Sequence, residues 1–259
     1  MRPLVVRVLD LLNRRGKALA VRLVYWTGKA PYPIHPKHLI DVPWHAWYLN
    51  EIHADDRVLD VGCGNGAHLL RARARCWEII GVDTDRAQLA IATRSIRERA
   101  VRYAHVLLHD ITRPLPWDAG RFDVVLCLDV LEHLAPRVEV LQEIHRVLTP
   151  TGRLCLAVPN RQTTWRRRLV QADLFAYSDP DHKTEYTLPE LWSELMAAGF
   201  QNEGQGAPIV YDTPWAGLID VVGGCSLGLY RSLSQWKRTA ALRHPEESTG
   251  FRIVARKRL

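Results

Sequence analysis

The chain has 259 residues, 47% of them hydrophobic, which is enough to bury one large core. Its five cysteines are scattered and lack C-x-x-C spacing, which argues against a structural zinc site and indicates a reducing compartment. The formal net charge of +7 favours anionic surroundings, whether nucleic acid, lipid headgroups or phosphorylated substrates, without selecting one of them.

The first 40 residues predict a helical extension followed by a linker. Apolar residues of segment 3–13 recur at helical spacing, Gly16 is expected to break this pattern, and a second apolar segment covers 18–26. The proline-rich stretch 31–36 then predicts a linker. We interpret the extension as packing on the rest of the chain or on a second subunit. Docking of this basic amphipathic segment on a membrane surface is the alternative.

The N-terminal apolar stretch does not have the pattern of a secretory signal, because charged residues interrupt it. No uncharged run approaches the roughly 20 residues that span a bilayer. We therefore expect a cytoplasmic protein, with a peripheral position at the inner face of the membrane as a further hypothesis.

Short apolar segments alternate with helical patterns from Arg57 onward, and this alternation predicts an α/β fold with a mostly parallel sheet. A helix is expected to begin near Trp44 and another to cover Leu188 to Ala198. We expect seven strands flanked by helices, with residues 1–40 as the extension and linker, 41–259 as the main domain, and a helical insertion at 214–247 before the last strand. The strands are expected at 57–61, 78–82, 104–108, 122–127 and 153–158, with a closing antiparallel pair at 201–211 and 250–257.

The strongest local motif runs from Val58 to Gly66, where an apolar strand enters a glycine-rich turn ahead of a helix. Glycines at this place let the backbone approach a ligand closely at a helix N-terminus, and the spacing also fits a relaxed dinucleotide fingerprint. The carboxylate of Asp60 would repel a pyrophosphate and attract a cationic sulfonium ligand. Asp83 ends the next strand about 20 residues on, where an acid can accept bonds from both ribose hydroxyls.

Three further segments complete a resemblance to the class I methyltransferase family. The third strand ends at 109–111, the fourth continues through 122–133, and 143–154 is similar to the family's helix, turn and fifth strand. The resemblance implies a Rossmann-like sheet and S-adenosylmethionine as cofactor, with S-adenosylhomocysteine as product. A nicotinamide-dependent dehydrogenase is the alternative for the cofactor.

The resemblance also assigns the cofactor residues one by one. They are Asp60, Gly62, Cys63, Gly64, Asn65 and Gly66 at the turn, Asp83 and Thr84 at the ribose, Asp110 and Ile111 at the adenine, and Leu128 beneath the sulfonium.

Two histidines are candidate catalytic residues. Methyl transfer to a hydroxyl needs removal of a proton, and His133 follows the fourth strand with a near-neutral intrinsic pKa. The alternative is that it only helps to start a helix. His182 lies in a loop similar to the acceptor loop of small-molecule O-methyltransferases, with a packing role as its alternative. In the same loop, Thr187 and Glu190 are expected to form a capping box.

A metal site is a further candidate, although our main prediction includes no metal. Asp129, Glu132 and His133 have the spacing i, i+3 and i+4, so one helical turn would present all three to a divalent cation. Methyltransferases that act on RNA 2′-hydroxyls or polyphenols use a similar cluster.

Our leading hypothesis for function is O-methylation of a glycan, glycolipid or other small-molecule hydroxyl. The basic N-terminal stripe, the insertion at 214–247 and the arginine run 166–168 would suit an amphiphilic, phosphorylated acceptor at a membrane face. The alternatives are a metal-assisted RNA 2′-O-methyltransferase and a non-catalytic S-adenosylmethionine-binding subunit. A homodimer is a further candidate assembly.

Overall fold

The computed structural model describes residues 3–201 and 206–258, and the chain divides into two compact units. The sheet unit comprises Ala46–Pro159, Asp181–Gly206 and Arg252–Leu259. The helical unit comprises Met1–His45, Asn160–Pro180 and Ala207–Phe251. The N-terminal segment and the insertion at 214–247 therefore belong to the same unit, although the chain separates them by almost its whole length.

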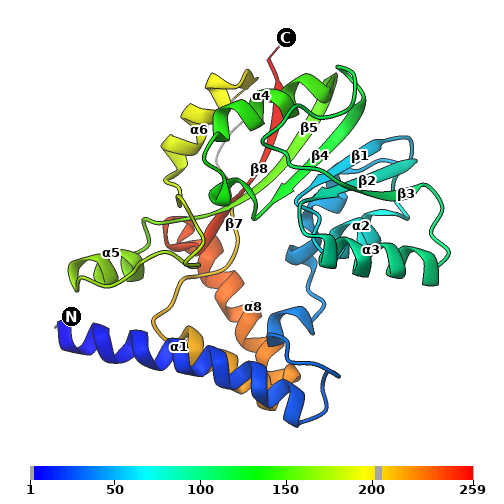
Figure 1. The fold of residues 1–259 in the computed structure, drawn as a ribbon. Helices are drawn as coiled ribbons and strands as arrows, with labels where there is room; N and C mark the ends of the chain where they lie inside the picture. The colour runs from blue at the N-terminus through cyan, green and yellow to red at the C-terminus, as the bar shows by residue number, and fades with distance from the viewer. Residues whose placement is uncertain (1–2, 202–205, 259) are drawn as a thin grey trace. The chain divides into compact units, whose positions relative to one another are not determined.

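The sheet has eight strands in the order β3-β2-β1-β4-β5-β8-β6, with β7 also paired to β8 (Figure 1). Pairing is parallel from β3 through β5, and β6 runs antiparallel to β8. The strands are β1 (Arg57–Val61), β2 (Glu78–Asp83), β3 (Ala104–Leu108), β4 (Phe122–Leu128), β5 (Leu148–Pro159), β6 (Phe200–Gln201), β7 (Ala207–Pro208) and β8 (Gly250–Lys257). The prediction of a mostly parallel α/β sheet is confirmed.

Two details of the sheet differ from the prediction. The strand expected at 201–211 is divided into β6 and β7, which raises the count from seven to eight, and residues 202–205 lie outside the described part. β5 begins at Leu148 and not at Arg153, because Leu148 pairs with Phe122 before an irregularity in the β4–β5 register. Pro150 and Gly152 lie inside this stretch and resemble turn residues, so composition alone hides it.

The helices of the sheet unit are α2 (Ala67–Ala72), α3 (Arg86–Glu98), α4 (Arg137–Val147) and α6 (Leu188–Ala197), and η3 (Leu131–His133) is a 3₁₀ turn. The predicted capping box of α6 is present, since Thr187 and Glu190 exchange side-chain to backbone hydrogen bonds. The helix expected near Trp44 is instead the 3₁₀ segment η2 (Pro43–Glu51), kinked at Ala46. Four of the five residues of β1 and five of the seven of β4 are buried, so the carboxyl ends of these strands provide a rigid edge for a site.

The helical unit contains α1 (Pro3–Trp26), η1 (Pro36–His38), α5 (Thr164–Gln171), α7 (Ala216–Cys225), α8 (Leu227–Arg243) and η4 (Pro245–Glu247). The prediction that Gly16 breaks the first helix is wrong, because α1 is continuous across it. A Cβ atom at Gly16 would lie 2.6 Å from the carbonyl oxygen of Gly217, so this glycine permits close packing of α1 on α7. Within 3–201 and 206–258, none of the helices is long and apolar enough to cross a membrane.

Candidate active site

The glycine-rich turn joins β1 to α2 in a backbone conformation that favours glycine. Gly62, Gly64 and Gly66 have φ values of +68°, +50° and +76°, where a side chain is strained. A Cβ at Gly62 would lie 2.4 Å from the Val130 side chain, whereas one at Gly64 would meet no atom within 4 Å. The turn thus packs against the loop after β4 at one glycine and leaves room over the next.

Two carboxylates in different surroundings flank this turn. Asp60 is buried, and burial followed by the charge of Asp83 raises the pKa of Asp60 to about 7. Its Oδ2 atom has no hydrogen-bond partner among the residues described. Asp83 accepts hydrogen bonds from the backbone N–H groups of Gly64 (2.8 Å) and Asp85 (2.8 Å). A cation beside Asp60 would relieve its cost of burial, whereas a diphosphate would add a like charge.

The remaining turn residues have local roles as well. Asn65 Oδ1 accepts a bond from the Ala67 N–H at the start of α2, at 3.2 Å. Cys63 is buried against Gly81, and burial raises the pKa of its thiol, which therefore stays protonated. These contacts shape the turn.

The residues predicted at the ribose, adenine and sulfonium follow β2, β3 and β4. Thr84 is exposed beside Asp83, Ile111 is buried, and Leu128 is partly buried at the end of β4. Asp110 Oδ1 accepts bonds from the N–H and hydroxyl of Thr112, which hold the pKa of Asp110 below its usual value. The structure therefore brings these positions to one edge of the sheet in the predicted strand order.

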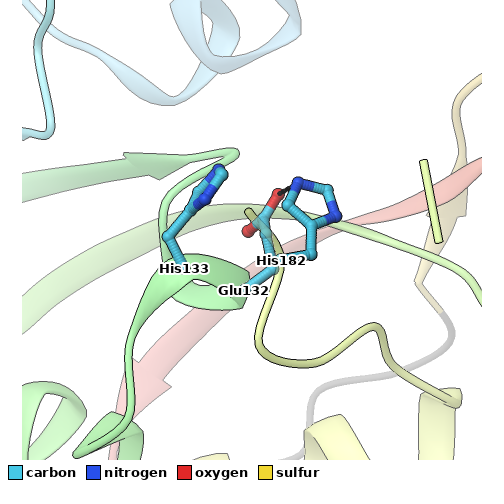
Figure 2. Close-up of side chains that lie close together, drawn as sticks. All are labelled: Glu132, His133 and His182. Carbon is cyan, nitrogen blue, oxygen red and sulfur yellow. Dashed lines mark ion pairs between the residues drawn. The ribbon is translucent and has the colours of Figure 1, made fainter. Parts of the chain in front are cut away.

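Glu132, His133 and His182 form a second cluster next to this edge (Figure 2). Their ligand atoms all lie within 4.8 Å of one another, and the two imidazole rings meet edge to face with centroids 4.6 Å apart. The Glu132 carbonyl accepts bonds from the N–H groups of Lys183 (2.9 Å) and Thr184 (3.2 Å), and these bonds fix the loop that holds His182. The cluster joins two segments about 50 positions apart in the sequence.

Burial favours the protonated form of Glu132 in this cluster. Glu132 is 1% exposed, and burial followed by Asp129 and Glu185 raises the pKa of Glu132 to about 8. Its Oε2 atom is buried without a hydrogen-bond partner in the described ranges. Glu185, which the sequence reasoning missed, is also buried, and its Oε1 lies 2.9 Å from His182 Nδ1. The spacing of His182 and Glu185 by three residues was the available signal.

The predicted metal trio is not presented by one helical turn. Asp129 has a φ of +57°, is exposed, and precedes η3, which begins only at Leu131. The group of potential ligands found in the described residues contains His182 in place of Asp129. The left-handed backbone of Asp129 ends the helical register that the i, i+3, i+4 spacing assumed.

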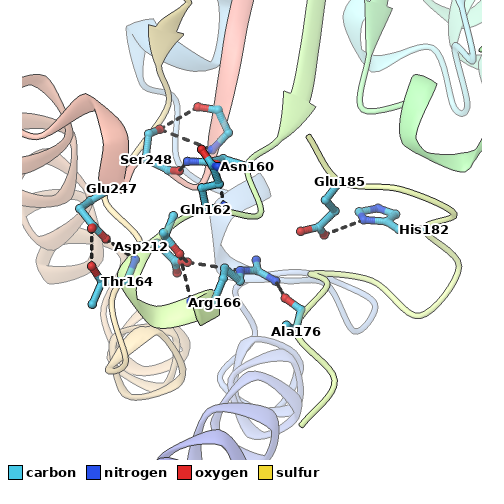
Figure 3. A network of polar contacts seen from close by, with 12 residues as sticks. Asn160, Gln162, Thr164, Arg166, Ala176, His182, Glu185, Asp212, Glu247 and Ser248 are labelled. Carbon is cyan, nitrogen blue, oxygen red and sulfur yellow. Dashed lines mark hydrogen bonds and ion pairs between the residues drawn. The ribbon is translucent and has the colours of Figure 1, made fainter. Parts of the chain in front are cut away.

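The arginine run has a structural role in the helical unit. Arg166 is buried, its Nε lies 3.3 Å from Asp212, and its guanidinium also donates to the Ala176 carbonyl (Figure 3). Arg167 lies 3.7 Å from Glu247. Two of these guanidinium groups therefore already have carboxylate partners, which weakens the expectation that the run holds a phosphate.

Comparison with known proteins agrees with this geometry. Residues 59–156 match the family model described as a methyltransferase domain. The segment 59–156 is thus similar to a methyltransferase domain, and the solved structures confirm the predicted Rossmann-like fold. The methyltransferase-domain match agrees with the S-adenosylmethionine cofactor that the sequence predicts.

A curated relative with a specific name is a ubiquinone biosynthesis O-methyltransferase of Pseudomonas aeruginosa. It is 32% identical over 150 residues, which are 56% of this chain and 61% of the relative, so the chain matches less than two thirds of its length. Among solved structures, the cyclase SpnF is similar with a TM-score of 0.61 and 21% identity, covering 83% of this chain and 81% of SpnF. An S-adenosylmethionine-dependent methyltransferase from Methanosarcina mazei has a TM-score of 0.57 and 20% identity, with coverage of 81% and 96%. These structures support the fold alone.

Proposed function

We propose that this protein transfers a methyl group from S-adenosylmethionine to a hydroxyl of a small-molecule, glycan or lipid-linked acceptor. The observation that carries the proposal is the buried Asp60 carboxylate beside an open glycine turn, with the His182 cluster on the adjoining loop. The O-methyltransferase name of the Pseudomonas relatives supports a hydroxyl acceptor. The fold alone is insufficient, because a similar fold occurs in a protein named a cyclase.

The turn binds and orients the cofactor in this proposal. Asp83 already fixes the Gly64 backbone and retains lone pairs for the ribose hydroxyls. Asp60 faces the positively charged end of the cofactor, and this charge lowers the pKa of Asp60 from about 7 on binding. S-adenosylmethionine supplies an electrophilic methyl group, so the protein needs mainly to align the acceptor and remove its proton.

His182 is the base that we assign to proton removal. The Glu185 carboxylate at 2.9 Å favours the tautomer in which Nδ1 carries the proton, so Nε2 is the atom that accepts the acceptor's proton. Glu185 then stabilises the imidazolium that forms, as an orienting carboxylate does in catalytic triads. His133 packs edge to face against the His182 ring.

A divalent cation at this cluster is the alternative to a histidine base, because Nε2 of His182 cannot bind an ion and accept a proton at the same time. One carboxylate and two imidazoles suit ions such as Zn²⁺ or Mn²⁺, and Glu132 Oε2, which has no hydrogen-bond partner among the described residues, fits a ligand role. Glu132, His133 and His182 would hold the ion, which would lower the pKa of the acceptor hydroxyl. Because Glu132 must lose its proton to bind, affinity for the ion is expected to rise as the pH increases through about 8.

The acceptor is tested with methyl-labelled cofactor and fractionated cell extract. We expect label in the lipid or small-molecule fraction, and we expect Asp83→Ala to abolish it by weakening cofactor binding. Label in RNA would support the RNA 2′-O-methyltransferase alternative, and cofactor binding without any labelling would support a non-catalytic subunit. Unchanged activity after chelation, together with no metal in the purified protein, would exclude the cation.

A further inference from the structure

Helix α1 has two opposite faces, both rich in apolar residues. The inner face follows helical spacing and is buried within the helical unit; it comprises Val6, Leu9, Gly16, Ala20 and Val24. Asn13 lies on the same line and its side chain accepts a bond from the Gly217 N–H at 2.9 Å. This face is therefore fully used by packing against α7 and α5.

The outer face runs along the whole helix and is exposed. Most of its members are spaced by three, four or seven residues, which places them on one side of the helix. They are Leu4, Val8, Leu11, Leu12, Leu19 and Trp26, interrupted by Arg15 and Arg22. The apolar members are between 41% (Leu19) and 72% (Leu4) exposed, which is far from the burial of an ordinary core position. A line of large exposed apolar side chains along one helix indicates a binding surface.

The charges of α1 indicate which partner suits this outer face. The helix contains five basic residues and one acid, Asp10, which is paired with Arg14 at 2.9 Å. Arg15 and Arg22 lie within the apolar line itself. A second copy of the chain on this face would bring these arginines close to their counterparts, whereas anionic lipid headgroups would neutralise them while the apolar side chains enter the acyl boundary.

We propose that the outer face of α1 docks on an anionic lipid bilayer surface. Trp26 at the end of the line suits the interfacial region, where an indole has both apolar and polar surroundings. The proposal concerns binding alone and does not depend on the reaction.

Vesicle co-sedimentation of the full-length protein tests this proposal without any substrate. Vesicles of phosphatidylcholine alone are compared with vesicles that contain half phosphatidylglycerol, at low and at high salt. The variants are Leu11→Gln/Leu19→Gln for the apolar line and Arg15→Gln/Arg22→Gln for its charge. Ile91→Gln/Met196→Gln is the matched control, since these residues are 50% and 54% exposed on α3 and α6.

The wild-type protein and the control are expected to bind the anionic vesicles with equal affinity. Leu11→Gln/Leu19→Gln is expected to reduce binding by about tenfold or more, and Arg15→Gln/Arg22→Gln by about 30-fold. Circular dichroism confirms that each variant is folded. The proposal is overturned if anionic vesicles bind no wild-type protein, or if the apolar variant binds as well as the control. It is also overturned if size-exclusion shows a dimer that the apolar variant converts to a monomer.

Discussion

Replacing Asp60 with asparagine is expected to stabilise the unliganded protein and weaken its binding of S-adenosylmethionine. Burial raises the pKa of Asp60 from 3.8 to about 7, so the folded state retains a proton that the unfolded state releases between these values. The stability of the unliganded protein therefore falls as the pH rises from about 4 to about 7, by up to about 4 kcal/mol for a shift of this size. Asparagine has nearly the same shape and no charge to bury, so the stability of the variant should not fall over this pH range.

The measurement is the free energy of unfolding in urea at pH 5 and pH 8, paired with calorimetric titration of S-adenosylmethionine. At pH 8 the Asp60→Asn variant should be more stable than the wild type by a few kcal/mol, and at pH 5 the difference should be smaller. Its affinity for the cofactor should fall about tenfold or more, because a carboxylate no longer faces the sulfonium. A variant with wild-type affinity, or with the same pH dependence of stability as the wild type, would refute the reasoning.

Four other substitutions, one of them with a matched control, test the assigned base and two packing roles. Glu185→Gln should lower kcat about tenfold or more while leaving cofactor affinity unchanged. His182→Gln should lower kcat about 100-fold. A wild-type kcat in either variant would contradict the assignment of His182 as the base that Glu185 orients. Gly16→Val should destabilise the protein by about 1–3 kcal/mol in urea, because its Cβ meets the Gly217 carbonyl, whereas exposed Ala18→Val on the same helix should cost less than 1 kcal/mol. Thr187→Ala should cost about 1 kcal/mol through loss of the α6 cap, and an unchanged urea midpoint would contradict that role.

Much of the sheet could be predicted because its strands have continuous apolar patterns between clear turn residues. The predicted range of β1 and that of β3 match the structure, and β2 and β4 each differ by one residue. The prediction fails where a turn-forming residue lies inside a strand or a helix. Pro150 inside β5 resembles a turn, yet the strand pairs with β4 on both sides of an irregular register. Gly16 resembles a helix end, yet close packing on α7 requires a residue without a side chain there.

The residues assigned to the cofactor follow strand ends, and parallel pairing fixes the order of those ends along one edge of the sheet. The cluster of Glu132, His133 and His182 could be predicted only in part. Spacing places Glu132 beside His133, but the left-handed backbone of Asp129 is not visible in the sequence. The approach of His182 depends on backbone bonds from Lys183 and Thr184 to the Glu132 carbonyl, and such a long-range pairing has no periodic signature.

Cofactor selection tests the central claim most directly, because the charge at the glycine turn distinguishes a sulfonium from a diphosphate. Calorimetric titration of the wild-type protein should show S-adenosylmethionine and S-adenosylhomocysteine binding at one site per chain, no binding of NAD, and loss of both signals in Asp83→Ala. Binding of NAD with no response to either sulfur compound would contradict the assignment of this turn.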